Sequence, residues 1–255
     1  MNKEYIDILK TKISYVKEGA GNPVVILHGW GASIETIAPI INILKDDFQV
    51  YAYDAPGFGD SDDPEEVLST YDYCEYLRAF LEKMNLDRAV FIGHSFGGKT
   101  LSIFAAKYPE KVEKLILIDA SGVKPRRKLH YYLKVYSFKF LKFLYLKLNF
   151  SKNKDERLES FYRKFGSDDY KQAQGIMRKT FVKVVNENTD VHFKDIKTPT
   201  LLVWGEKDED TPLYMAEVFE KNIEDSGLVI LKNAGHYSYL DDYYTFQAVL
   251  KSFLG

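Results

Sequence analysis

The sequence predicts an α/β fold with an open, mostly parallel β-sheet, helices on both faces and a helical insertion. Short apolar runs rich in β-branched residues alternate with amphipathic helical patterns at both ends of the chain. Polar or glycine-rich loops follow these runs. The alternation stops over residues 124–188, where only helical patterns occur. Sheets of this type bind ligands at the carboxyl ends of their strands, so we expect functional residues in those loops.

Length and composition point to one large core. The chain has 255 residues, of which 45% are hydrophobic, and this favours a single domain with an insertion. The formal net charge of -2 provides no overall attraction for nucleic acid or an anionic membrane, and we expect no nucleic-acid partner.

The single cysteine, Cys74, excludes an internal disulfide and favours a reducing compartment. Charges interrupt residues 1–10, so this stretch does not have the pattern of a signal peptide. The sequence also contains no apolar run of about 18 residues, as a membrane span needs. We therefore expect a cytoplasmic protein without a membrane span.

Eight short runs have the pattern of strands, and the first two, joined by Lys10 and Thr11, form a hairpin. Helical spacing predicts five helices around them, the first capped by Ser33. The turn-forming stretch 54–62 excludes regular structure. The predicted strands are 5–9, 12–17, 24–27, 48–53, 88–92, 112–118, 199–204 and 227–231, and the helices are 34–44, 70–85, 99–107, 212–222 and 240–254.

The insertion is predicted to be helical over residues 124–150, 155–165 and 167–188, with Ser167 as a cap of the last helix. We accordingly divide the chain into a core, residues 1–122 and 192–255, and a cap over residues 123–191.

Residues 124–150 include eight basic residues and no acidic one. Such a basic amphipathic helix can lie on a membrane surface or cover a site for an anionic substrate. Alternatively, it packs its apolar face on the domain and leaves its lysines in solvent. We favour packing, because lysine stems cover apolar surface and the whole chain is not basic. The apolar face consists of Leu129, Leu133, Tyr136, Phe140, Phe143 and Leu144.

The stretch Gly93-His-Ser-Phe-Gly-Gly98 joins a predicted strand to a predicted helix. A serine at such a junction occupies a tight, strained turn that lifts its hydroxyl away from the backbone. Gly93 and Gly97 remove side chains that would collide across the turn. Ser95 is therefore the candidate nucleophile.

A serine hydroxyl needs a base, usually a histidine oriented by a carboxylate. Of the five histidines, His236 alone follows the last predicted strand, and we assign it as the base. The acid should follow another strand between Ser95 and His236. Asp208 is favoured over its acidic neighbours Glu206, Glu209 and Asp210, and Asp119 is the main competitor.

An oxyanion formed on attack needs two backbone N–H donors. Phe96, which follows the nucleophile, and Trp30, between Gly29 and Gly31, are the candidates. A simple turn is the alternative interpretation of this glycine-rich loop. We expect substrate contacts from His28, Gly29, Met177, Phe181 and Tyr237.

Several of these stretches together resemble the α/β-hydrolase superfamily, over residues 5–122 and 199–255. The branch that appears most similar comprises esterases and carbon–carbon bond hydrolases of the meta-cleavage type, and there the acid matches Asp208 and the base matches His236. The resemblance implies the α/β-hydrolase fold and a cap whose inner surface selects the substrate. It rests on 28–31 as the oxyanion loop, 54–61 as a turn, 93–97 as the nucleophile elbow, and 205–208 with 235–236.

These observations predict a serine hydrolase that cleaves an ester of a small to medium, largely apolar molecule through an acyl-enzyme, without a metal or other cofactor. Carbon–carbon bond hydrolysis of a vinylogous diketone uses the same three side chains and is the alternative. A slow-turnover ligand sensor is a rival from another class. The sequence gives no indication of the oligomeric state.

Overall fold

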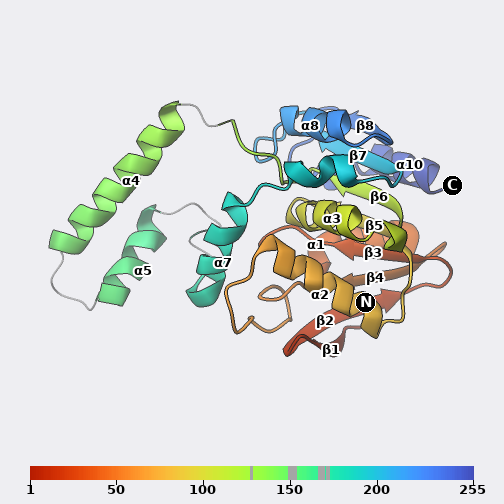
Figure 1. Cartoon of the computed structure of the whole chain (residues 1–255), viewed down its shortest axis with the longest axis horizontal. Coiled ribbons are helices and arrows are strands. Elements are labelled where there is room, and N and C mark those ends of the chain that lie inside the picture. The colour runs from red at the N-terminus through yellow and green to blue at the C-terminus, as the bar shows by residue number, and fades with distance from the viewer. Residues whose placement is uncertain (127–128, 149–153, 166–169, 171–172) are drawn as a thin grey trace.

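A computed structural model of the chain describes residues 1–126, 129–148, 154–165, 170 and 173–255, and Figure 1 shows its arrangement. Its centre is one eight-stranded sheet with the order β1-β2-β4-β3-β5-β6-β7-β8. The strands are β1 (Glu4–Ile8), β2 (Thr11–Glu18), β3 (Pro23–Leu27), β4 (Gln49–Tyr53), β5 (Ala89–His94), β6 (Val112–Ile118), β7 (Thr200–Gly205) and β8 (Ser226–Leu231).

The sheet is parallel from β4 to β8 and antiparallel only where β2 pairs with β1 and with β4. This confirms the predicted eight-stranded, mostly parallel sheet with an opening hairpin. The central strands are buried along their whole length, as β5 and β7 illustrate. Strands covered on both faces need apolar side chains at every position, which explains why they appear as continuous hydrophobic runs.

Helices cover both faces of the sheet and create two cores. One face carries α2 (Thr70–Lys83), α3 (Phe96–Lys107) and α8 (Tyr214–Asn222), and the other carries α1 (Ile34–Leu44), α9 (Ser238–Asp241) and α10 (Tyr243–Leu254). Short 3₁₀ turns, η1 (Pro109–Lys111) and η2 (Asp190–Asp195), precede β6 and β7. Because helices pack on both faces, the strand ends remain the place where loops can build a site.

Several helix boundaries differ from the prediction, and those of α3 and of the last predicted helix differ most clearly. The helix predicted over 99–107 already begins at Phe96, directly after Ser95. The helix predicted over 240–254 is divided into α9 and α10 at Asp242, which has φ −130° and ψ 63°. Its side chain accepts a hydrogen bond from the amide of Thr245, so Asp242 caps a new helix instead of continuing the old one.

The segment between β6 and η2 contains three described helices, α4 (Leu129–Leu148), α5 (Lys154–Phe165) and α7 (Gly175–Asn186). In Figure 1, α4 and α5 lie to one side of the sheet, and α7 lies between them and the sheet. Ser167, the predicted cap, lies outside the described residues. The division of the chain at residues 123 and 191 stays a prediction.

Four of the six residues of the predicted apolar face of α4 are exposed instead of packed on the domain, contrary to our expectation, while Leu144 is half-buried and the side chain of Leu129 is not described. Leu133, Tyr136, Phe140 and Phe143 are each 60–65% exposed. The opposite side of α4 contacts α5 instead, where the rings of Phe138 and Phe161 lie 5.1 Å apart. No helix among the described ranges is long and apolar enough to cross a membrane.

Candidate functional site

Ser95 lies at the turn between β5 and α3 with φ 51° and ψ −110°. A positive φ is strained for a residue other than glycine, so the surrounding structure must hold this turn in place. The Ser95 amide donates to the carbonyl of Ile118 (3.0 Å), and its carbonyl accepts from the amides of Lys99 and Ser121 (3.1 Å each). These bonds fix the serine at the carboxyl end of β5, beside the end of β6.

Glycines around Ser95 allow backbone segments to approach closely. A Cβ on Gly97 would lie 2.4 Å from the carbonyl oxygen of Leu27, and one on Gly93 would lie 2.6 Å from the amide nitrogen of Gly98. Both neighbouring atoms belong to the backbone and cannot move aside as a flexible side chain could. The turn therefore requires glycine at both positions.

Three of the predicted site residues form one chain of hydrogen bonds. His236, in the loop after β8, has its Nε2 3.0 Å from Ser95 Oγ and its Nδ1 2.9 Å from Asp208 Oδ2. The carboxylate accepts the proton on Nδ1, which leaves Nε2 free to accept the hydroxyl proton of Ser95. This geometry can transfer a proton from Ser95 to His236.

Asp208 is buried in the loop after β7 and accepts four hydrogen bonds. Oδ1 accepts from the amides of Asp210 (2.8 Å) and Thr211 (2.9 Å), while Oδ2 accepts from Thr211 Oγ1 (2.6 Å) and His236. Burial alone raises the pKa of Asp208, but the bonds from His236 and Thr211 outweigh it and lower this pKa below its ordinary value. Asp208 is thus held ionised.

The pairing of Asp208 with His236 also shifts the pKa of the imidazole. Burial lowers the pKa of His236, but its bond to Asp208 and the negative charge there outweigh that effect and raise the pKa above its ordinary value. A raised pKa makes the ring a stronger base once it is neutral.

Asp119, the competing acid, lies at the end of β6 but does not bond to the imidazole of His236. Its Oδ1 accepts from the Gly205 amide (2.8 Å), and its Oδ2 accepts from the amide and the hydroxyl of Ser238 (3.1 and 2.6 Å). Burial outweighs these bonds and raises the pKa of Asp119 to about 7. Through its bonds to Gly205 and Ser238, Asp119 connects the loops that carry Asp208 and His236.

The loop after β3 lies directly against Ser95. A Cβ on Gly29 would be 3.2 Å from the Cβ of Ser95. The Trp30 ring packs edge-on against Phe96, with ring centres 5.4 Å apart. Phe96 is the first residue of α3, so its amide has no carbonyl partner within that helix. Both predicted oxyanion residues therefore lie beside Ser95.

The side chain of His94 lies beside the site, which differs from our prediction. We expected its side chain to point away from Ser95 around the turn, yet its Nε2 donates to the carbonyl of His236 (2.7 Å) and the two rings lie 5.0 Å apart. Burial and the adjacent His236 lower the pKa of His94 to about 3, so His94 is a neutral side chain that supports the backbone of His236. Its position next to Ser95 in the sequence was the available signal.

A cavity of about 350 Å³ opens in front of Ser95. Of the expected substrate contacts, Gly29, Phe181 and Tyr237 line it. Met177 instead contacts Gly57 at a second, neighbouring pocket. His28 is buried, accepts a bond from the Ala55 amide (3.0 Å) through Nε2 and donates from Nδ1 to the Gly29 carbonyl (2.7 Å), so its ring supports the loop from below.

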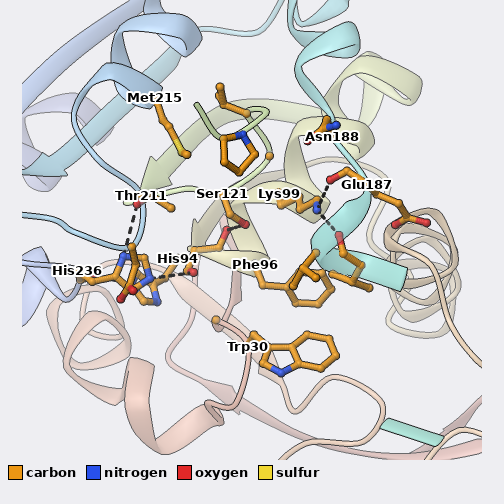
Figure 2. Close-up of a pocket in the computed structure, with 18 of the residues that line it drawn as sticks. Trp30, His94, Phe96, Lys99, Ser121, Glu187, Asn188, Thr211, Met215 and His236 are labelled. Carbon is orange, nitrogen blue, oxygen red and sulfur yellow. Dashed lines mark hydrogen bonds between the residues drawn. The ribbon is translucent and has the colours of Figure 1, made fainter. Parts of the chain in front are cut away.

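Lys99 is a further cavity residue that sequence reasoning missed. Its ammonium donates to the carbonyls of Val184 and Glu187 (2.6 Å each), at the end of α7. Figure 2 shows Lys99 directed to Glu187, on the other side of the cavity from His236. Burial lowers the pKa of Lys99 to about 8. A lysine among the small, buried residues of α3 was the signal in the sequence.

One group of side chains in the described part of the chain has the spacing of a metal site. Ligand atoms of Asp208, Asp210 and His236 lie within 4.8 Å of one another. Asp208 and His236 are already bonded to each other, however, and a metal ion would have to break that bond. We therefore interpret them as partners of Ser95.

Comparisons with known proteins agree with this architecture. Residues 22–243 match the protein family described as "alpha/beta hydrolase fold". A 2-hydroxy-6-oxo-2,4-heptadienoate hydrolase from Pseudomonas putida is 27% identical over 262 residues, which cover 92% of this chain and 90% of that protein.

Two further similarities are limited, the first in the length that it covers and the second in sequence identity. The abhydrolase domain-containing protein abhd-5.2 of Caenorhabditis elegans is 38% identical over 105 residues, which are 39% of this chain but only 23% of that protein. The crystal structure described as a membrane phospholipase A, a bacterial virulence factor, superposes with a TM-score of 0.78 at 23% identity and covers 99% of this chain and 85% of that one. This structural likeness concerns the fold alone.

Proposed function

Because this chain belongs to the α/β-hydrolase family, we propose that it is a serine hydrolase that cleaves a neutral, largely apolar ester through an acyl-enzyme. The observation that supports this most strongly is the continuous hydrogen-bonded series from Ser95 through His236 to Asp208, with distances of 3.0 and 2.9 Å. In this proposal Ser95 is the nucleophile, His236 the base and Asp208 the group that orients the imidazole.

The proposed reaction has two halves. Ser95 Oγ attacks the ester carbonyl while His236 Nε2 takes its proton, and the amides of Trp30 and Phe96 stabilise the negative charge on the carbonyl oxygen. The imidazolium then protonates the leaving alcohol, and an acyl-enzyme forms. Water, deprotonated by His236, attacks the acyl group, and Ser95 recovers its proton as the acid departs.

The charges around the cavity support a neutral substrate. Among the described residues that line it, Lys99 is the only lysine or arginine, and its ammonium is bonded to two carbonyls of the protein. Glu187 and Asp210 add acidic groups to the lining. A substrate carboxylate would therefore meet acidic groups and a cation that is already engaged.

Carbon–carbon bond hydrolysis is the second candidate, because the Pseudomonas putida relative, matched over 90% of its length, is named a hydrolase of 2-hydroxy-6-oxo-2,4-heptadienoate, and this substrate contains no ester. The name of that substrate indicates a carboxylate, for which the cavity of this chain offers no free lysine or arginine among its described residues. This difference favours the ester.

Two esters with the same leaving group test the proposal. We expect p-nitrophenyl butyrate to be hydrolysed with a kcat/KM at least tenfold above that of p-nitrophenyl hemisuccinate, which has a carboxylate at the end of its acyl group. Ser95→Ala should abolish both activities. A preference for the hemisuccinate, or faster turnover of a meta-ring-fission product than of either ester, would contradict the proposal.

A further inference from the structure

One face of α4 is apolar, aromatic and exposed. We define the outer stripe as Leu133, Tyr136, Phe140 and Phe143, which are spaced three or four residues apart and so lie on one side of the helix. Each of them is 60–65% exposed. Large apolar side chains gathered on one surface, rather than scattered singly, indicate an interaction site.

The outer stripe is not the inside of a displaced lid, because α4 already packs through its other side. Tyr145 and Phe138 contact the buried ring of Phe161 on α5, at 5.5 and 5.1 Å between ring centres. Lys142 bonds to the hydroxyl of Tyr162, also on α5. The side of α4 that carries these residues is anchored, and helical periodicity places the outer stripe on the opposite side, away from α5.

Lysines accompany the exposed rings. The ammonium of Lys139 lies 5.8 Å from the ring centre of Tyr136, and that of Lys147 lies 5.8 Å from the ring centre of Phe143. Long lysine stems lie along apolar surface and keep their charge at its edge. Aromatic rings with flanking cations match the boundary between lipid headgroups and acyl chains.

The charge of this region differs from that of the whole chain. Residues 124–150 contain eight basic residues and no acidic one, whereas in the rest of the chain acidic residues outnumber basic ones by ten. Two of these eight, Lys124 and Arg126, are exposed just before the helix. A positively charged helix on an otherwise acidic protein favours one orientation toward an anionic surface.

We propose that the outer stripe of α4 docks on an anionic lipid surface, with its rings at the level of the acyl chain boundary and its lysines beside the phosphate groups. Charge decides against a second copy of this chain as the occupant. A symmetric contact through the stripe would bring Lys139 and Lys147 of one copy close to the same lysines of the other. An anionic bilayer complements those charges and accepts the rings.

Vesicle flotation tests the proposal with the full chain. We expect binding to vesicles of equimolar phosphatidylcholine and phosphatidylglycerol, little binding to phosphatidylcholine alone, and weaker binding when NaCl rises from about 0.1 M to about 1 M, because salt screens the attraction. Lys139→Gln with Lys147→Gln should weaken binding roughly tenfold or more. Tyr136→Ser with Phe140→Ser and Phe143→Ser should abolish it.

Matched controls use exposed residues far from α4. Lys221→Gln with Lys232→Gln removes the same charge, and Tyr244→Ser removes a ring that is 81% exposed, so both should bind as the wild type does. Phe140→Trp should also show a blue-shifted emission on binding, which reports insertion of the ring rather than charge attraction alone.

Three results would overturn the proposal. The first is wild-type protein that stays unbound in the presence of anionic vesicles. The second is an outer-stripe variant that binds like the wild type. The third is a wild-type protein that sediments as a dimer and a triple variant, Tyr136→Ser, Phe140→Ser and Phe143→Ser, that sediments as a monomer, while neither of the two binds vesicles. The last result would assign the stripe to a second copy of the chain.

Discussion

Replacing Asp208 with asparagine should remove the carboxylate that we propose orients His236, while the surrounding fold is kept. An asparagine keeps the two backbone bonds from Asp210 and Thr211 only if its oxygen takes the place of Oδ1. Its NH₂ group then takes the place of Oδ2, 2.9 Å from His236 Nδ1. An amide donor there makes Nδ1 an acceptor and leaves the proton on Nε2, which faces Ser95.

The wrong tautomer cannot accept the hydroxyl proton of Ser95. We expect kcat to fall by about 10⁴-fold, which corresponds to about 5.5 kcal/mol of lost transition-state stabilisation. Hydrolysis of p-nitrophenyl butyrate measures the rate, and circular dichroism verifies that the variant is folded.

Asp119→Asn is the matched control, because Asp119 accepts bonds from Gly205 and Ser238 and none from the imidazole of His236. An NH₂ group must then face one of these donors, and we expect a stability loss of about 1–3 kcal/mol. Turnover should stay within about tenfold of the wild type at a temperature where the protein is folded. Folded Asp208→Asn with more than a tenth of wild-type activity, or a folded but inactive Asp119→Asn, would refute this reasoning.

Three further predictions concern pH, packing and the thiol. Because the proposed base His236 can accept a proton only when neutral and its pKa is raised, kcat/KM should fall as the pH falls through a value above the ordinary 6.5 or so of histidine; a rate that is flat down to pH 5 or so would contradict this. Gly97→Ala places a methyl group 2.4 Å from a backbone oxygen and should destabilise the fold by about 3 kcal/mol in urea denaturation. Gly227→Ala, whose Cβ meets no atom within 4 Å, should leave stability unchanged or slightly raised. Burial raises the pKa of Cys74 to about 12, so Ellman's reagent should find no reactive thiol in the native protein and one per chain after denaturation; rapid reaction of the native protein would show that the packing around α2 is wrong.

The sequence was most informative where local chemistry determines structure. Strands covered on both faces are continuous apolar runs, so residues 24–27 and the run 115–118 within 112–118 indicated central strands. Gly93, Ser95 and Gly97 indicated a turn that only glycines permit, and the order of Ser95, Asp208 and His236 along the chain indicated which loops meet.

Contacts between distant segments were beyond the sequence. His94 was expected to point away from the nucleophile, yet it supports the backbone of His236, 142 positions later. The choice of Asp208 among the acidic residues of its loop rested on resemblance. Asp119 stayed a competitor, because both residues follow strands and only the relative position of the loops separates a partner of the imidazole from a residue that connects loops. The apolar residues of α4 indicated a helix face but could not say what the face contacts.

Covalent labelling tests the central claim most directly. A fluorophosphonate reacts with an activated serine, and we expect stoichiometric inactivation of p-nitrophenyl butyrate hydrolysis with the adduct located on Ser95 by peptide mass spectrometry. Ser95→Ala should take up no label. Full activity after prolonged exposure to the reagent, or an adduct on another residue in the inactivated protein, would contradict the assignment of Ser95 as the nucleophile.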